Sequence, residues 1–122
     1  MIAADTSTWI SFFEGDAGDD VAALAAALGS RQIVMPPPVL TELLSDPAIS
    51  KPVVRLLLDL PLMKLEEGFW QRAGLLRATA LARKRKARLG DALIAQCCID
   101  ADVKLITRDA DYKAFVGGLK LA

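Results

Sequence analysis

The residues best suited to chemistry in this sequence are acids that stand at the ends of short apolar runs. Asp5 follows the run at the N-terminus, Glu42 comes soon after a second run, Asp91 lies at the start of an apolar helical pattern, and Asp109 follows a later run. The chain contains no His, and His is the commonest general base and the commonest transition-metal ligand. Any catalysis by this chain would therefore depend on carboxylates.

The adjacent residues Cys97 and Cys98 offer no alternative chemistry. Neighbouring cysteines cannot close a loop with each other, and they lack the spacing of a zinc site. Because free Cys is among the most buried residue types, we expect both to be small core residues on an apolar helix.

Each of the four acids also has an ordinary structural explanation. Asp91 comes just before a helical pattern, so it can be a helix N-cap, which is worth about 1 kcal/mol. The other three can be caps or surface charges. A functional site requires the acids to converge, and two carboxylates about 4 Å apart repel by roughly 4 kcal/mol at an effective dielectric constant of about 20. Such a cluster needs protons or a cation.

A carboxylate cluster without His or usable Cys favours a hard divalent ion, Mg²⁺ or Mn²⁺. Such an ion activates water and stabilises the charge that develops during phosphodiester hydrolysis. A basic run stands directly before Asp91 and consists of Arg83, Lys84, Arg85, Lys86 and Arg88. Its cations can hold a polyanion through phosphate contacts, although a solvated helix end has the same composition. The combination predicts a metal site beside a surface that binds nucleic acid.

Short apolar runs alternate with helical patterns along the chain, which predicts an α/β fold. Five such runs are expected to be strands, at 1–4, 33–35, 62–65, 103–106 and 119–121. This alternation is typical of a parallel sheet that is covered by helices on both faces. Ligands of such sheets bind beyond the carboxyl ends of the strands. The four acids are therefore expected to converge at that edge.

The helical patterns between these runs have recognisable starts. Helices are expected at 6–13 with Thr6 or Ser7 as the cap, at 19–28, after the prolines at 36–38, at 50–58, from 69 to the basic run, and from Asp91 onward. Asp19 and Asp20 begin the second of these helices, where acids suit the positive end of the helix dipole. We therefore assign both a structural role.

The length of the chain predicts a single domain that spans residues 1–122. Lys and Arg together equal Asp and Glu at 15 each, so the distribution of charge matters more than the net charge. Hydrophobic residues make up 53% of the chain, an excess that suggests a self-association surface. We expect no signal peptide before the first strand, and the longest purely apolar run, at 21–28, is too short to cross a membrane. A cytoplasmic protein without a membrane partner is expected.

Three segments cover nearly the whole chain: MIAADTSTWI at the start, VLTELLSDP in the middle, and LGDALIAQCCIDADVKLITRDADYKAF near the end. In this order and spacing, the sequence resembles PIN-domain nucleases, and more closely the VapC toxins of type II toxin–antitoxin pairs. The family's four acids fall on the same four positions that follow from the apolar runs, which are Asp5, Glu42, Asp91 and Asp109.

The resemblance implies a three-layer α/β/α sandwich with a short parallel sheet of four to five strands. It also implies a Mg²⁺- or Mn²⁺-dependent endoribonuclease that acts on RNA, forms a homodimer and is restrained by a small cognate antitoxin. Thr6 matches a hydroxyl that often follows the first acid, and Thr107 matches one two residues before the last. Asp111 matches an acid that is sometimes present, so it is an accessory candidate for binding the metal.

The roles that follow are hypotheses for these positions. Asp5, Asp91 and Asp109 are expected to contact the metal directly or through water. Glu42 is expected to bind the metal or to orient the attacking water. The basic run at 83–88 can bind RNA or help to seat the antitoxin, because both partners would approach the same opening.

Three alternatives remain open on the sequence. A solitary PIN nuclease outside a toxin–antitoxin operon would have much the same sequence. A non-catalytic α/β interaction module would use the acids as caps and the apolar excess as a partner surface. A receiver-like domain ranks last, because it needs a phospho-accepting Asp at the end of its central strand, and the third run here ends in Leu65, Glu66 and Glu67.

Overall fold

Two short strands, six α-helices and one 3₁₀ helix make up the chain, and the computed structural model describes all 122 residues. The elements are β1 (Ile2–Ala4), α1 (Thr6–Glu14), α2 (Asp19–Gly29), α3 (Pro37–Leu44), α4 (Lys51–Asp59), α5 (Phe69–Ala82), α6 (Leu89–Ala101), β2 (Lys104–Ile106) and the 3₁₀ helix η1 (Ala110–Phe115). The helices predicted from the sequence are all present, which confirms an α/β chain. None of them is long and apolar enough to cross a membrane.

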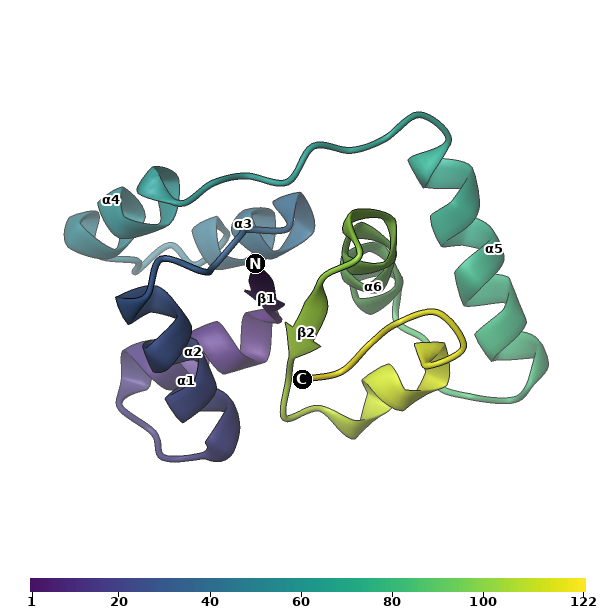
Figure 1. The fold of residues 1–122 in the computed structure, drawn as a ribbon, viewed down its shortest axis with the longest axis horizontal. Helices are drawn as coiled ribbons and strands as arrows, with labels where there is room; N and C mark the ends of the chain where they lie inside the picture. The colour runs from purple at the N-terminus through teal and green to yellow at the C-terminus, as the bar shows by residue number, and fades with distance from the viewer.

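The centre of the molecule is a short parallel pair of strands with helices arranged around it (Figure 1). Ala3 of β1 lies opposite Leu105 of β2, and Ala4 lies opposite Ile106. All four side chains are buried. Both α2 and α6 pack against β2, so the pair is enclosed by helices, as the continuous apolar runs predict.

The other three predicted strands are reduced to single parallel bridges. These bridges join Ile33 to Ile2, Leu62 to Met35, and Leu121 to Leu105. The expectation of four to five regular strands is therefore met by only two. Proline explains part of the difference, because Pro36 is followed at once by α3 and Pro61 has no backbone N–H to donate to a ladder.

Two helix starts differ from those predicted. The cap of α1 is Asp5, whose side chain accepts a hydrogen bond from the Thr8 backbone N–H, so neither Thr6 nor Ser7 is the cap. Helix α6 begins at Leu89, with Arg88 as its N-cap residue, so Asp91 lies inside the first turn and does not cap the helix. The ordinary reading of Asp91 as an N-cap is therefore wrong, and its carboxylate is free to face another part of the molecule.

The basic run forms the connection between α5 and α6. Arg83 ends α5, and Lys84 has the positive φ of 58° that turns the chain. The buried Ala87 anchors this connection, because its carbonyl accepts a hydrogen bond of 2.8 Å from Nε of Arg77. All five cations of the run are exposed.

Helix α6 supplies much of the core and explains the paired cysteines. Cys97 and Cys98 are both buried and both unpaired. Burial raises the pKa of each thiol to about 12. The expectation that they are core residues is confirmed, since thiols held in this protonated form are poor nucleophiles and poor metal ligands.

Candidate metal centre

The site lies at the carboxyl edge of the strand pair. Asp5 follows β1 directly, and Thr107 follows β2. The backbone N–H of Asp5 donates to the carbonyl of Ile106 at 3.1 Å, which continues the parallel register by one step. This register places Asp5 beside the loop that contains Thr107 and Asp109, although Asp5 and Thr107 are 102 residues apart in the chain.

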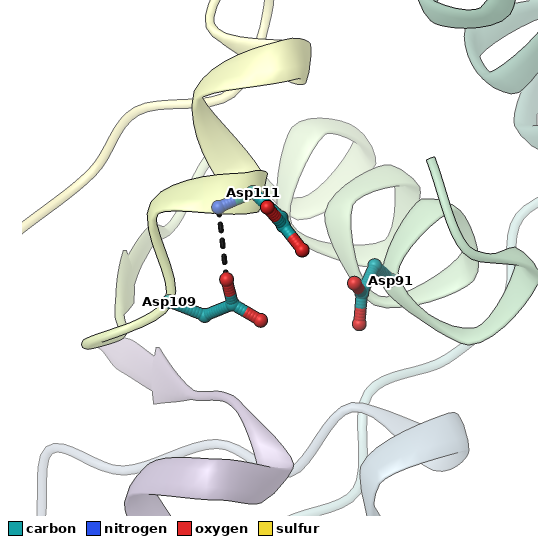
Figure 2. A group of neighbouring side chains, drawn as sticks. All are labelled: Asp91, Asp109 and Asp111. Carbon is teal, nitrogen blue, oxygen red and sulfur yellow. Dashed lines mark hydrogen bonds between the residues drawn. The ribbon is translucent and has the colours of Figure 1, made fainter. Parts of the chain in front are cut away.

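Three carboxylates converge at this edge. Asp91, Asp109 and Asp111 each offer one oxygen, and these oxygens all lie within 4.8 Å of one another. Figure 2 shows the carboxylates of Asp109 and Asp111 on the η1 side of a shared space, with that of Asp91 on the α6 side. All three residues are partly buried. Asp109 also caps η1 by accepting a 2.8 Å hydrogen bond from the backbone N–H of Asp111, so one carboxylate fixes the position of the next.

Asp5 lies next to this cluster, buried and with both of its carboxylate oxygens hydrogen-bonded. It is 2% exposed, and its carboxylate accepts from the hydroxyls of Ser7 and Thr107 and from the backbone N–H of Thr8. The Thr107 hydroxyl oxygen also accepts a 3.0 Å hydrogen bond from the backbone N–H of Asp109. Thr107 therefore joins the buried acid to the cluster.

Glu42 stands at the exposed rim of the site, on α3. The hydroxyl of Thr6 donates to its Oε1 at 2.7 Å. Gly90, at the start of α6, lies so close that a Cβ there would be 3.5 Å from Glu42 Oε2. The two threonines that the family resemblance singles out thus hold two different acids, Thr6 holding Glu42 and Thr107 holding Asp5.

Burial and mutual repulsion both act on the cluster. The pKa of Asp91 is raised, mainly by burial and further by the negative charges of Asp109 and Glu42. The hydrogen bond that the Tyr112 hydroxyl donates to Asp91, at 3.2 Å, and the charge of Arg88 oppose this rise. A cation placed among the carboxylates would remove the repulsion.

Tyr112 is a site residue that the sequence reasoning missed. It is 1% exposed, and its pKa is raised first by burial and then by the charges of Asp91, Asp5 and Glu42. It therefore remains a neutral donor that holds Asp91 in place. The only signal in the sequence was that the single Tyr of the chain directly follows Asp111.

The donor set fits a hard divalent ion. The available ligands are carboxylate oxygens, which Mg²⁺ and Mn²⁺ prefer. The one cation that pairs with the cluster is Lys86, whose Nζ lies 3.4 Å from Asp111 Oδ2. Of the five acids expected to bind metal, the structure brings Asp91, Asp109 and Asp111 together. Asp5 and Glu42 border the cluster without entering that set of oxygens.

Comparisons with known proteins match this chain over nearly its whole length. The family model of the PIN domain matches residues 2–117. The chain is 31% identical over 120 residues to ribonuclease VapC11 of Mycobacterium tuberculosis, and equally to a VapC ribonuclease of Mycobacterium bovis, with 92% of this chain and 89% of theirs covered.

Solved structures of bacterial proteins share the fold of this chain. VapBC2 from Rickettsia felis, bound to a DNA fragment from its promoter, matches with a TM-score of 0.75 and 21% identity over 100% of this chain and 98% of that one. FitAcB from Neisseria gonorrhoeae matches with a TM-score of 0.71 and 14% identity, covering 99% and 96%. At these identities the likeness shows the fold alone. The family match and the curated relatives show that this chain belongs to the PIN-domain family.

Proposed function

We propose that this PIN domain is a metal-dependent endoribonuclease that acts as the toxin of a type II toxin–antitoxin pair. The observation that carries the proposal is the convergence of Asp91, Asp109 and Asp111, whose carboxylate oxygens lie within 4.8 Å of one another. The relatives named VapC ribonuclease, which are 31% identical over 92% of the chain, supply the reaction class.

Each acid of the site has a role that depends on its position. Asp91, Asp109 and Asp111 would hold the ion, and a bound Mg²⁺ or Mn²⁺ would supply water activation and charge stabilisation for phosphodiester hydrolysis. Asp5 adds a buried negative charge beside the ion and keeps the Thr107 loop in register. Glu42 lies at the exposed rim, where Thr6 holds its Oε1, and we assign it the role of accepting a hydrogen bond from the attacking water and so orienting it.

We assign the basic run at 83–88 to the RNA backbone. Its five exposed cations lead directly into the helix that carries Asp91, and Lys86 already reaches Asp111. Each phosphate that such cations contact adds affinity that weakens as salt rises. An antitoxin with acidic groups would compete for the same surface, and salt dependence measured with RNA and with antitoxin would separate the two roles.

The protein partners that we expect follow from the likeness to solved structures. FitAcB and VapBC2 are two-protein assemblies by name, which supports a small cognate antitoxin as the partner of this chain, and we propose a homodimer as its own assembly.

The parallel bridges at Ile33, Leu62 and Leu121 extend the strand pair on both sides. They support the five-stranded sheet of a three-layer sandwich.

Cleavage of a mixed, labelled RNA pool tests the proposal. The purified protein is assayed in EDTA, in Mg²⁺ and in Mn²⁺, beside Asp91→Asn prepared in the same way. We expect metal-dependent cuts that fall at least a hundredfold in the variant. The variant should fold normally, because Asp91 caps nothing and the amide oxygen of Asn can still accept the hydrogen bond from Tyr112.

Thermal melting across a metal titration shows whether the protein binds metal even if no RNA cleavage is seen. A preformed carboxylate site should raise the melting temperature in millimolar Mg²⁺ or Mn²⁺, since a ligand at ten times its dissociation constant adds about 1.4 kcal/mol of stability. Metal-dependent melting without cleavage would indicate a narrow RNA target outside the pool. Metal indifference together with no cleavage would instead favour the non-catalytic module.

A further inference from the structure

Arg108 lies between two residues of the site but points away from it. Its Nε donates to Asp20 Oδ2 at 2.7 Å and its Nη2 to Asp20 Oδ1 at 3.0 Å, a two-point contact with a carboxylate on the first turn of α2. The same Nη2 also reaches the carbonyl of Ala17 at 3.4 Å. The loop between β2 and η1 is therefore tied to the start of α2 by a planar, bidentate pair.

Asp20 is in turn tied to the first turn of α1. The hydroxyl of the fully buried Thr8 donates to Asp20 Oδ2 at 3.0 Å, while the backbone N–H of Thr8 donates to Asp5. The Arg108 guanidinium lowers the pKa of Asp20, so this carboxylate remains an anion. One network thus joins α1, α2 and the loop that carries Asp109 and leads into η1, where Asp111 lies.

Gly18 leaves the space in which this pair forms. A Cβ at Gly18 would lie 2.6 Å from Asp20 Oδ1 and 2.9 Å from Arg108 Nη2, and its φ is +156°. Gly15, at the other end of the same turn, would meet nothing within 4 Å. A Cβ at Gly18 would therefore push the ends of the Asp20 and Arg108 side chains apart, and the positive φ disfavours a side chain at Gly18 and Gly15 alike.

We propose that the pair of Asp20 and Arg108 is a positioning device that sets the place of Asp109 and Asp111 opposite Asp91. The loop after β2 has no further strand hydrogen bonds to define it. Thr107 holds it at the site, Arg108 holds it from behind, and the buried Tyr112 of η1 anchors the segment that follows it. Groups that orient metal ligands from outside commonly change metal affinity 10- to 100-fold when removed. This inference rests on the proposed metal site.

The chain contains a matched control in a second pair of the same kind. Arg72 on α5 donates to Asp100 on α6 through Nε at 3.1 Å and Nη2 at 2.6 Å. The arginine side chains are similarly exposed, at 41% for Arg72 and 38% for Arg108. Asp100 lies nine residues after Asp91 on the same helix, which is roughly 14 Å along its axis. Breaking this pair removes the same chemistry far from the acids.

The test measures Mn²⁺ binding by calorimetry for the wild type, Arg108→Met, Arg108→Lys and Arg72→Met, with urea unfolding of each. We expect Arg108→Met to weaken Mn²⁺ binding at least tenfold, Arg108→Lys to recover part of the loss, and Arg72→Met to change it less than twofold. Equal affinities in the two Met variants, or unchanged affinity in a folded Arg108→Met, would overturn the proposal.

Amide hydrogen exchange in EDTA provides a readout that needs no metal. Arg108→Met should speed exchange at the backbone N–H groups of Asp109 and Asp111 at least tenfold, while Arg72→Met should leave these two unchanged. If the wild type binds no Mn²⁺, the metal site itself is wrong, and the exchange data then decide the positioning role separately. Equal exchange in both variants would refute that role.

Discussion

At the scale of single residues, the site is built by hydroxyls as much as by acids. Thr107 donates to the buried Asp5 and accepts from the backbone N–H of Asp109. Thr6 donates to Glu42, and Tyr112 donates to Asp91. Each hydroxyl offers a negative group a partner that carries no positive charge, so the acids stay in place without losing the negative potential that attracts a cation.

Thr107→Val tests this arrangement, since it replaces the hydroxyl by a methyl group. Asp5 would lose one of its donors, and the N–H of Asp109 would lose its acceptor. Leaving a buried polar group unpaired costs about 1 to 3 kcal/mol, and we expect a loss of stability in that range together with at least tenfold slower RNA cleavage. Thr107→Ser, which keeps the hydroxyl, should recover most of both. Urea unfolding and the cleavage rate at fixed Mg²⁺ measure the two effects, and a fully active Thr107→Val would contradict the bridging role.

The candidate site was predictable from the sequence only where local patterns apply. Asp5 directly follows the apolar run that became β1, and Asp109 comes three residues after the run that became β2, so the parallel rule placed them at one edge. Tyr112 and Arg108 were missed because their roles depend on which distant residue each one faces. Asp91 was correctly placed near a helix start, but the alternative that it caps the helix stayed open, because the sequence cannot show that Arg88 already begins the helical hydrogen bonding.

At the scale of elements, helices were predicted better than strands. A helix forms from local hydrogen bonds that start with residues such as Ser50, whose hydroxyl caps α4. A strand needs a partner elsewhere in the chain, and the segments at Ile33 and Leu62 are held by only a few backbone hydrogen bonds. The sequence therefore predicted the position of each strand segment, while the length of its ladder depends on the tertiary structure.

The contact between α5 and α6 predicts a pH dependence of stability. The Arg72 side chain lowers the pKa of Asp100 in the folded protein, first through its hydrogen bonds, and Gln96 contributes another. An acid with a lowered folded pKa stabilises the fold above its unfolded value, about 3.9 for Asp, and this contribution is lost as the pH falls through the folded pKa. Arg72→Met should therefore be less stable than the wild type at pH 7, and the difference should shrink as the pH is lowered below about 4.

Urea unfolding of the two proteins at several pH values between 3 and 7 measures this difference. The wild type should lose more stability than the variant over the acid part of the range, because only the wild type has the favourable pair to lose. Gln96→Leu serves as a control that removes the weaker partner of Asp100. A stability difference that stays constant down to pH 3 would show that Arg72 acts through packing rather than through charge.

At the scale of the whole molecule, the apolar excess of the sequence is partly left on the surface. On α5, Trp70 is 64% exposed and Leu81 is 46% exposed. They are eleven residues apart, close to three helical turns, so they lie on the same side of the helix. Trp70 also lines a groove of about 290 Å³ with Leu65, Leu93 and Glu42. A large aromatic side chain exposed beside a groove makes this face a candidate contact surface for a second protein.

We expect the proposed homodimer to form through this face of α5, and Trp70→Ser tests this expectation. Covering a large apolar side chain contributes about 2 kcal/mol. Because both chains of a symmetric dimer carry the variant, dimerisation should weaken at least thirtyfold and up to roughly a thousandfold. Sedimentation equilibrium across a range of protein concentrations measures the dissociation constant. The matched control is Leu58→Ser on α4, where the leucine is 60% exposed but lies on another helix. If Leu58→Ser dissociates the dimer and Trp70→Ser does not, the contact lies on α4, and the groove beside Trp70 is left open to a different partner.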